Sequence, residues 1–253
     1  NPALTPIISG TAVVCAGTST TLTASSAIGT TPLTYVWSTG ATSAAITVTP
    51  NATTSYSVSI TDANGCSATS LVTTVTVNQL PVVNAGNDAT ICNGASTTLL
   101  ATGATNYVWS PSTGLATTNT ASVVASPSAT TTYTVTGTDA NGCVDTDTVT
   151  VNVVNQPLAT ISASAATICA GATTTLTANA GTGYTYSWSN GASTQSIIVS
   201  PATTATYTVT VTNSTGCSTT SAVQTITVNP ALTPIISGTA VVCAGTSTTL
   251  TAS

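Results

Sequence analysis

The chain of 253 residues contains no Lys, Arg, His, Glu, Met or Phe, and its five acids are all Asp. Because no cationic side chain is present to neutralise phosphate, nucleic acid and anionic membrane surfaces are excluded as partners. Because neither His nor Lys is present to activate the many Ser and Thr hydroxyls, we expect no enzyme and no catalytic residue. No apolar run approaches the roughly eighteen residues of a membrane-spanning helix, so we expect no membrane insertion.

Small hydroxyl side chains dominate what is present, with 64 Thr and 30 Ser. This composition suits strands and turns and is poor for helices. Hydrophobic residues make up 42% of the chain, which argues for a packed core. Apolar and polar residues alternate, as in residues 56–60 and 207–211, and Asn-Gly dipeptides separate the runs. The pattern predicts an all-β protein of antiparallel sandwiches with six or seven strands each.

Internal repetition defines the domain organisation. Residues 1–25 recur letter for letter as residues 229–253, which sets a repeat of 228 residues. Inside it lie three divergent copies of one unit, each with a Cys-x-Gly, an aromatic-x-Trp, a Tyr-x-Val alternation and a Gly-Cys turn. The predicted modules are residues 1–78, 79–155 and 156–228, with residues 229–253 opening a fourth. We expect the chain to be a window from a longer array.

A module of about 76 residues has a marginal core, so we expect a buried Trp and a covalent staple in each. The expected core residues stand at matching positions in the three modules: Trp37, Trp109 and Trp188, with Tyr56, Tyr133 and Tyr207. Seven cysteines indicate an oxidising, extracellular setting, and without His or a Cys-x-x-Cys motif we expect no metal site. We predict that six are oxidised: Cys15, Cys66, Cys92, Cys143, Cys169 and Cys217. Cys243 copies Cys15, and its partner would lie beyond Ser253.

Two disulfide connectivities remain open. Pairing within modules joins Cys15 to Cys66, Cys92 to Cys143 and Cys169 to Cys217, and each bridge contributes on the order of 4 kcal/mol by limiting the unfolded chain. In a seven-strand immunoglobulin topology, however, the first and second cysteines lie at opposite ends of the sandwich, whereas disulfide Cα atoms lie at most about 7 Å apart. Cys15 would then bond Cys143, and Cys92 would bond Cys217. We favour the pairing within modules, because the short link before the Ile46 strand removes strands and so brings the two cysteines to the same end of the sandwich.

The motif order resembles a known group of proteins. Cys-x-Gly, Tyr-x-Trp-Ser, Pro-x-x-Thr-x-x-Tyr-x-Val, Asp-x-Asn-Gly-Cys and Val-x-Val follow one another as in the tandem immunoglobulin-like and PKD-like repeats of giant Bacteroidota surface proteins, gliding-associated adhesins among them. Module 3 departs from the pattern, with Asn213 in place of the Asp. The resemblance implies export to the cell surface by the type IX route and an adhesive or structural role. Thr148, in Asp147-Thr148-Val149, is similar to the O-glycosylation site of these bacteria.

Two functions from different classes fit the sequence. The first is the structural shaft of an extracellular filament or giant surface adhesin, with modules joined head to tail and chains associating laterally. The second is a surface that binds ice or glycans through Thr arrays such as residues 130–132 and 204–208. Asp62-Ala-Asn-Gly65 and Asp139-Ala-Asn-Gly142 offer oxygens to calcium, but each has one carboxylate, so we interpret them as hairpin turns. We expect no cofactor.

Overall fold

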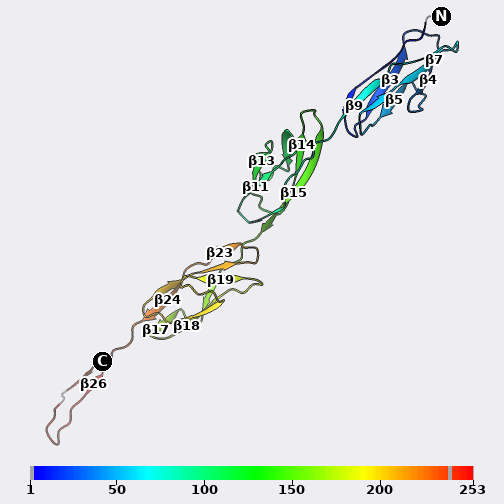
Figure 1. The fold of residues 1–253 in the computed structure, drawn as a ribbon. Helices are drawn as coiled ribbons and strands as arrows, with labels where there is room; N and C mark the ends of the chain where they lie inside the picture. The colour runs from blue at the N-terminus through cyan, green and yellow to red at the C-terminus, as the bar shows by residue number, and fades with distance from the viewer. Residues whose placement is uncertain (1–2, 239–240, 253) are drawn as a thin grey trace. The chain divides into compact units, whose positions relative to one another are not determined.

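The computed structural model describes residues 3–238 and 241–252, and within these ranges every regular element is a β-strand (Figure 1). The all-β prediction is therefore confirmed, and no helix in the described part of the chain is long and apolar enough to cross a membrane. Three hydrophobic cores form, from residues 8–77, 83–153 and 159–228. The chain divides into two compact units, Asn1–Val153 with the first two cores and Val154–Ser253 with the third.

Module 1 is a two-layer sandwich. One layer has the strand order β1-β3-β5, and the other combines β4-β7-β8 with β2-β9-β6. The strands are β1 Pro6–Gly10, β2 Val13–Cys15, β3 Thr20–Ser26, β4 Thr34–Trp37, β5 Ala45–Val48, β6 Thr54–Tyr56, β7 Val58–Thr61, β8 Ser67–Thr69 and β9 Thr73–Asn78. Because β1 and β2, β6 and β7, and β8 and β9 are each parts of one segment, the nine strands of the sandwich form six strand segments.

The first segment of the module changes layers between β1 and β2. Gly10 lies at the change with a φ of 150°, and a Cβ there would clash with the carbonyl oxygen of Thr21. The backbone can therefore approach β3 this closely only with glycine at this position. After the change β2 runs parallel to β9, with Cys15 opposite Asn78. The alternation in the sequence predicted antiparallel strands and did not reveal this parallel pair.

Module 2 has the sheet order β10-β15-β14-β12 and a two-stranded sheet of β11 and β13. Its strands are β10 Ala89–Cys92, β11 Thr97–Leu100, β12 Asn106–Ser110, β13 Ser122–Ala125, β14 Thr131–Thr138 and β15 Val144–Val154. β14 and β15 pair without interruption over eight residues of β14. The Asn141-Gly142 dipeptide lies in the turn that joins them, as the sequence indicated.

Module 3 repeats the sheet orders of module 1, as β16-β18-β20, β17-β24-β21 and β19-β22-β23. Its strands are β16 Ile161–Ala163, β17 Thr167–Cys169, β18 Thr174–Ala178, β19 Thr185–Trp188, β20 Ser196–Val199, β21 Ala205–Tyr207, β22 Val209–Thr212, β23 Ser218–Thr220 and β24 Gln224–Asn229. Beyond it, β25 (Ile236–Ser237) pairs with β26 (Thr251–Ala252). Ile236 lies opposite Ala252, the register that Ile8 and Ala24 adopt between β1 and β3.

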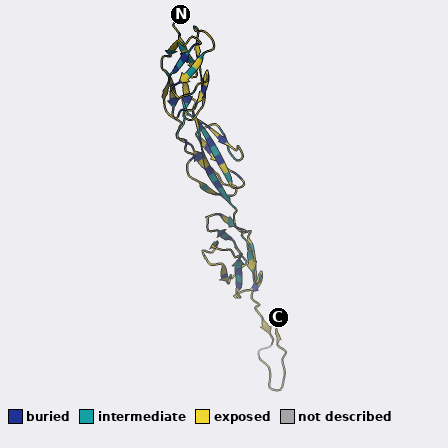
Figure 2. Cartoon of the chain, turned by 90° about the vertical axis from the view of Figure 1, so that its right-hand side faces the viewer, coloured by how far each residue is buried: buried dark blue, intermediate teal, exposed yellow. Residues whose placement is uncertain are grey.

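The cores are built from the inward face of each strand, and the alternation of buried and exposed residues is visible along the strands in Figure 2. Trp37, Trp109 and Trp188 are 2%, 2% and 3% exposed. Each indole nitrogen donates to a backbone carbonyl, namely those of Ser43 (2.8 Å), Thr120 (3.0 Å) and Thr194 (2.8 Å). Tyr56 and Tyr133 are buried as well, whereas Tyr207 is only partly buried. Each module thus centres on one hydrogen-bonded indole.

Candidate functional site: a covalent joint between modules

The first cysteine of a module lies beside that module's last strand. Cys15 ends β2, and the amide of Ala16 donates to the carbonyl of Asn78 at 2.9 Å. The amide of Thr18 then donates back to the carbonyl of Cys15 at 2.9 Å, closing a turn in which Gly17 has a φ of 75°. That left-handed conformation explains the glycine of the Cys-x-Gly motif.

The same turn follows Cys169 in module 3. Ala170 donates to the carbonyl of Asn229 at 2.9 Å, and Ala172 donates to that of Cys169 at 3.0 Å. Cys169 also lies opposite Asn229 in the parallel pair of β17 and β24. The first cysteine is thus held at the end of the module where the chain leaves it.

The second cysteine ends a tight turn organised by a side-chain oxygen. Oδ1 of Asp139 accepts hydrogen bonds from the amides of Asn141 and Cys143, both at 2.8 Å. In module 1, Oδ1 of Asp62 accepts from the amides of Asn64 at 3.0 Å and Cys66 at 2.9 Å. Such Asx turns present the following cysteine in one fixed direction.

Module 3 builds the same turn with an amide in place of the carboxylate. Oδ1 of Asn213 accepts from the amides of Thr215 at 3.1 Å and Cys217 at 2.9 Å. The position therefore requires an acceptor oxygen and no charge. The departure of module 3 from the motif leaves the turn intact.

Hydrogen bonding also governs the Asp62 carboxylate. Burial acts to raise the pKa of Asp62, but backbone amides of Thr30, Cys66 and Asn64 outweigh it and hold the pKa below its usual value. Both carboxylate oxygens are used, since Oδ2 accepts from Thr30 at 3.3 Å. Among the described residues, no group of three or more His, Cys, Asp or Glu lies close enough to hold a metal ion. The geometry is that of a hairpin turn.

The two cysteines of module 1 lie at opposite ends of the sandwich. β6 begins with Thr54 opposite Val75, near the end of the module, and β7 finishes with Thr61 opposite Thr34 at the other end. Seven steps at about 3.3 Å give about 23 Å between these levels. A disulfide tolerates about 7 Å between Cα atoms, so Cys15 and Cys66 cannot reach one another.

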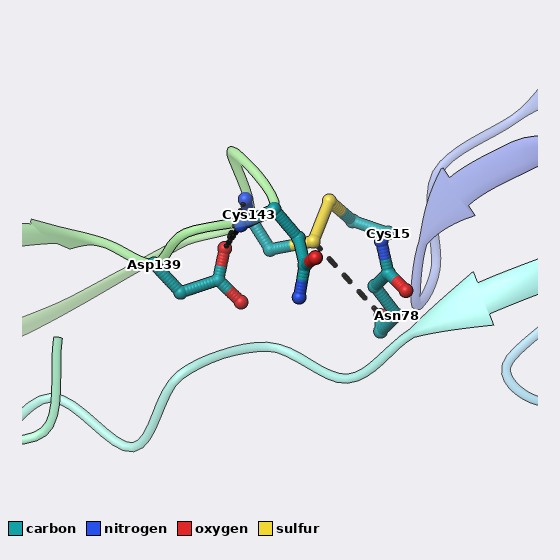
Figure 3. Close-up of a disulfide and its surroundings, with 5 residues drawn as sticks. Cys15, Asn78, Asp139 and Cys143 are labelled. Atoms are coloured by element: carbon teal, nitrogen blue, oxygen red, sulfur yellow. Dashed lines mark hydrogen bonds between the residues drawn. A yellow bond between two sulfur atoms is a disulfide. The ribbon is translucent and has the colours of Figure 1, made fainter. Parts of the chain in front are cut away.

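Cys15 forms its disulfide with Cys143 of module 2 (Figure 3). The bond has a Cα–Cα distance of 5.6 Å and spans 128 residues of sequence. Cys143 is only 1% exposed, and its Sγ lies 4.0 Å from the carbonyl oxygen of Asn78, the residue that leads from module 1 into the linker. The joint therefore places a covalent bond alongside the peptide linker.

The pairing of Cys15 with Cys66 was wrong, and so were the equivalent pairings in modules 2 and 3. Cys143 bonds Cys15 instead, Cys92 and Cys217 are disulfide-bonded, and Cys66 and Cys169 are exposed free thiols. Oxidation of all six cysteines within this chain was therefore wrong for Cys66 and Cys169. The physical reason is strand direction, because β4 and β5 of module 1 run the same way, so the turns at Cys15 and Cys66 stay at opposite ends of the sandwich.

The hydroxyls of the first Thr array, residues 130–132, are hydrogen-bonded within the module. The Thr130 hydroxyl accepts from the amide of Val153 at 3.0 Å, and that of Thr131 donates to the carbonyl of Ala129 at 2.8 Å. Thr132 shares a hydrogen bond of 3.0 Å with Thr150 on the neighbouring strand. Every hydroxyl of this array is thus engaged within the module. Thr148 lies exposed on β15.

Comparisons with known proteins concern the fold. The chain matches no protein-family model and no curated protein sequence. Solved structures similar to it include titin domains I67–I69 (13% identity, TM-score 0.40, 90% of this chain and 100% of that one) and extracellular domains 3–5 of Drosophila OTK (13%, 0.37, 90% and 99%). Another is a Ca²⁺-stabilized adhesin of an Antarctic bacterium (16%, 0.38, 94% and 77%). The sheet orders of the three modules, independently of these similarities, make the chain a tandem array of immunoglobulin-like β-sandwiches.

Proposed function

We propose that this chain is a structural segment of an extracellular shaft, built from the modules 1–78, 79–155 and 156–228 joined head to tail. The observation that carries the proposal is the disulfide from Cys15 to Cys143, which links neighbouring modules in parallel with the peptide linker. A bond between modules adds nothing to the core of either one. It limits how far the two modules can separate or rotate, which is useful in a chain under tension.

The surface chemistry supports the same role. Exposed strand positions carry hydroxyl pairs directly opposite one another, as in Ser59 with Thr69 (2.7 Å) and Thr210 with Thr220 (2.9 Å). Such pairs satisfy cross-strand neighbours without charge. With a net charge of −5 over the chain, repulsion between neighbouring modules or chains is weak, so lateral association costs little electrostatically. The chain also offers no site to trypsin-like proteases outside the cell.

A surface that binds ice or glycans through free Thr hydroxyls is less well supported. The hydroxyls of residues 130–132 are engaged, and Thr204 accepts from the amide of Val228 at 3.1 Å. Only part of each array is left for a ligand. Glycosylation at Thr148 and secretion by the type IX route remain proposals that follow from the resemblance to Bacteroidota surface repeats.

Electron microscopy of chains carrying several 228-residue repeats tests the proposal. We expect slender filaments whose axial period equals three modules, roughly 100–130 Å if a strand of about 7 residues rises about 3.4 Å per residue and turns and linker add about half again. Thermal hysteresis of the same material tests the alternative. Compact particles, or hysteresis without filaments, would overturn the shaft.

A further inference from the structure

Two exposed thiols stand at positions where the neighbouring copies form disulfides. Cys66 ends the same Asx turn as Cys143, with amide-to-Oδ1 distances of 2.9 Å and 2.8 Å. Cys169 begins the same Cys-x-Gly turn as Cys15, and in each turn the next amide donates at 2.9 Å to the carbonyl of the asparagine that ends the module's last strand. Cys15 and Cys143 are bonded to each other, whereas Cys66 and Cys169 are free. Cys66 and Cys169 therefore occupy the two positions that the disulfide joins in Cys143 and Cys15, but each is a free thiol.

A second observation is that the second cysteine has the same local contact in modules 2 and 3. The Sγ of Cys143 lies 4.0 Å from the carbonyl oxygen of Asn78, and the Sγ of Cys217 lies 4.0 Å from that of Val154. Asn78 and Val154 are equivalent, because each follows by three residues the valine opposite Thr54 or Thr131. Both Cys143 and Cys217 are 1% exposed, while Cys66 is exposed. A preceding module would cover Cys66 as module 1 covers Cys143.

The repeat supplies the missing partner. Residues 229–253 have the sequence of residues 1–25, and their hairpin has the same register as the start of module 1. We propose that Cys169 of one 228-residue repeat forms a disulfide with Cys66 of the following repeat. The inference rests on the proposed head-to-tail shaft and gives the joint between repeats the same kind of bond that joins Cys15 to Cys143.

The bond forms by thiol–disulfide exchange with a small-molecule disulfide such as oxidised glutathione. The Cys169 thiolate attacks that disulfide, forms a mixed disulfide and releases one glutathione thiolate. The Cys66 thiolate then attacks the Cys169 sulfur, forms the protein disulfide and releases the second glutathione. The two protein thiols lose two protons and two electrons, and the oxidant is reduced to two thiols.

The test is a chain of two successive 228-residue repeats followed by residues 229–253, folded in a glutathione redox buffer. Ala231, which is exposed and is the third residue of the second repeat, is replaced there (Ala231→Lys). Because the sequence has no Lys or Arg, trypsin then cuts only at the joint between repeats. We expect one full-length band on a denaturing gel without reductant and two halves after reduction.

Matched variants identify the bond. Cys169→Ser in the first repeat is expected to release the halves without reductant, whereas Cys92→Ser, one module earlier, is expected to leave them joined. The proposal is overturned if the two halves separate without reductant in the chain that keeps all its cysteines. It is also overturned if the halves stay joined in the Cys169→Ser variant. Electron microscopy of the same chain tests the proposed shaft separately from the disulfide. The bond can form in a chain that makes no filament, and a filament can form without the bond.

Discussion

In each module, one side-chain oxygen holds the turn at the second cysteine by accepting two backbone hydrogen bonds. The position four residues before the second cysteine is Asp in modules 1 and 2 and Asn in module 3. In each case its Oδ1 accepts from the amides two and four residues later. The acceptor geometry was predictable from the Asp-x-Asn-Gly-Cys motif, because short polar side chains cap such turns. The equivalence of Asn213 was not, because it depends on which atom accepts.

Asp62→Asn tests how much the charge contributes. Because the pKa of folded Asp62 is lowered, its stabilisation is present above the ordinary Asp pKa of about 3.9 and is lost as the pH falls through the folded value. The variant keeps the Oδ1 acceptor but loses the acceptor for Thr30. We expect the variant to be less stable than the parent at pH 7 and the difference to shrink as the pH falls below about 4 toward the lowered folded pKa.

Urea unfolding of both chains from pH 3 to pH 7 measures this difference. Asp62→Ala, which removes both acceptors, serves as the reference and is expected to be less stable than the parent at every pH. A difference between parent and Asp62→Asn that grows toward acid would contradict the assignment.

The buried indoles give a second prediction. Trp37→Phe removes the donor to the Ser43 carbonyl and leaves a cavity, so we expect local stability in module 1 to fall by about 1–3 kcal/mol. Hydrogen exchange over β4 and β7 measures the loss. Val36→Thr, next to it but on the exposed face, should change exchange by about 0.5 kcal/mol or less. Equal effects of the two substitutions would show that Trp37 is not the centre of the core.

The buried face of each strand was predictable from the sequence, but the pairing of the strands was not. Period-two alternation located β6, β7, β14 and β22 because it reports directly which side of a strand is buried. It does not report pairing direction, so the parallel pair of β2 and β9 was missed. The short link before the Ile46 strand does leave out a strand, but β4 and β5 run in the same direction, so the two cysteine turns remain at opposite ends.

A β-bulge in modules 1 and 3 was also invisible in the sequence. Ser55 lies opposite Thr74 and Ser59 opposite Thr69, so the segment between β8 and β9 contains one extra residue. The Ser70 hydroxyl, which is buried, accepts from the amide of Val58 at 3.1 Å, while Leu71 is 90% exposed. The extra residue of the bulge therefore leaves Leu71 exposed, and the alternation of apolar residues did not predict this.

Ser70→Ala tests the role of this hydroxyl. Loss of the acceptor leaves the buried amide of Val58 unpaired, and we expect about 1–3 kcal/mol less protection of that amide in hydrogen exchange. Ser221→Ala should do the same to Val209 in module 3, where the distance is also 3.1 Å. Ser67→Ala, at an exposed position on β8, is the control and should leave Val58 unchanged.

For the chain as an array, the disulfide joint matters most. The composition indicated an oxidising setting, and the 228-residue repeat indicated a linear array. The partner of each cysteine could not be read from spacing, since 51 residues within a module and 128 residues between modules both allow a bond. Only the positions of the two turns at opposite ends of a sandwich decide between them.

The covalent joint is tested most directly by cutting the linker that it bypasses. Gln79 is exposed just after β9, and Gln79→Lys creates the only trypsin site in the chain. If Cys15 bonds Cys143, the cut chain is expected to run as one molecule on a denaturing gel without reductant and as fragments of 79 and 174 residues after reduction. Adding Cys15→Ser should release the fragments without reductant, and adding Cys66→Ser should not. Release of the two fragments from the Gln79→Lys chain without any reductant would contradict a covalent joint between the modules.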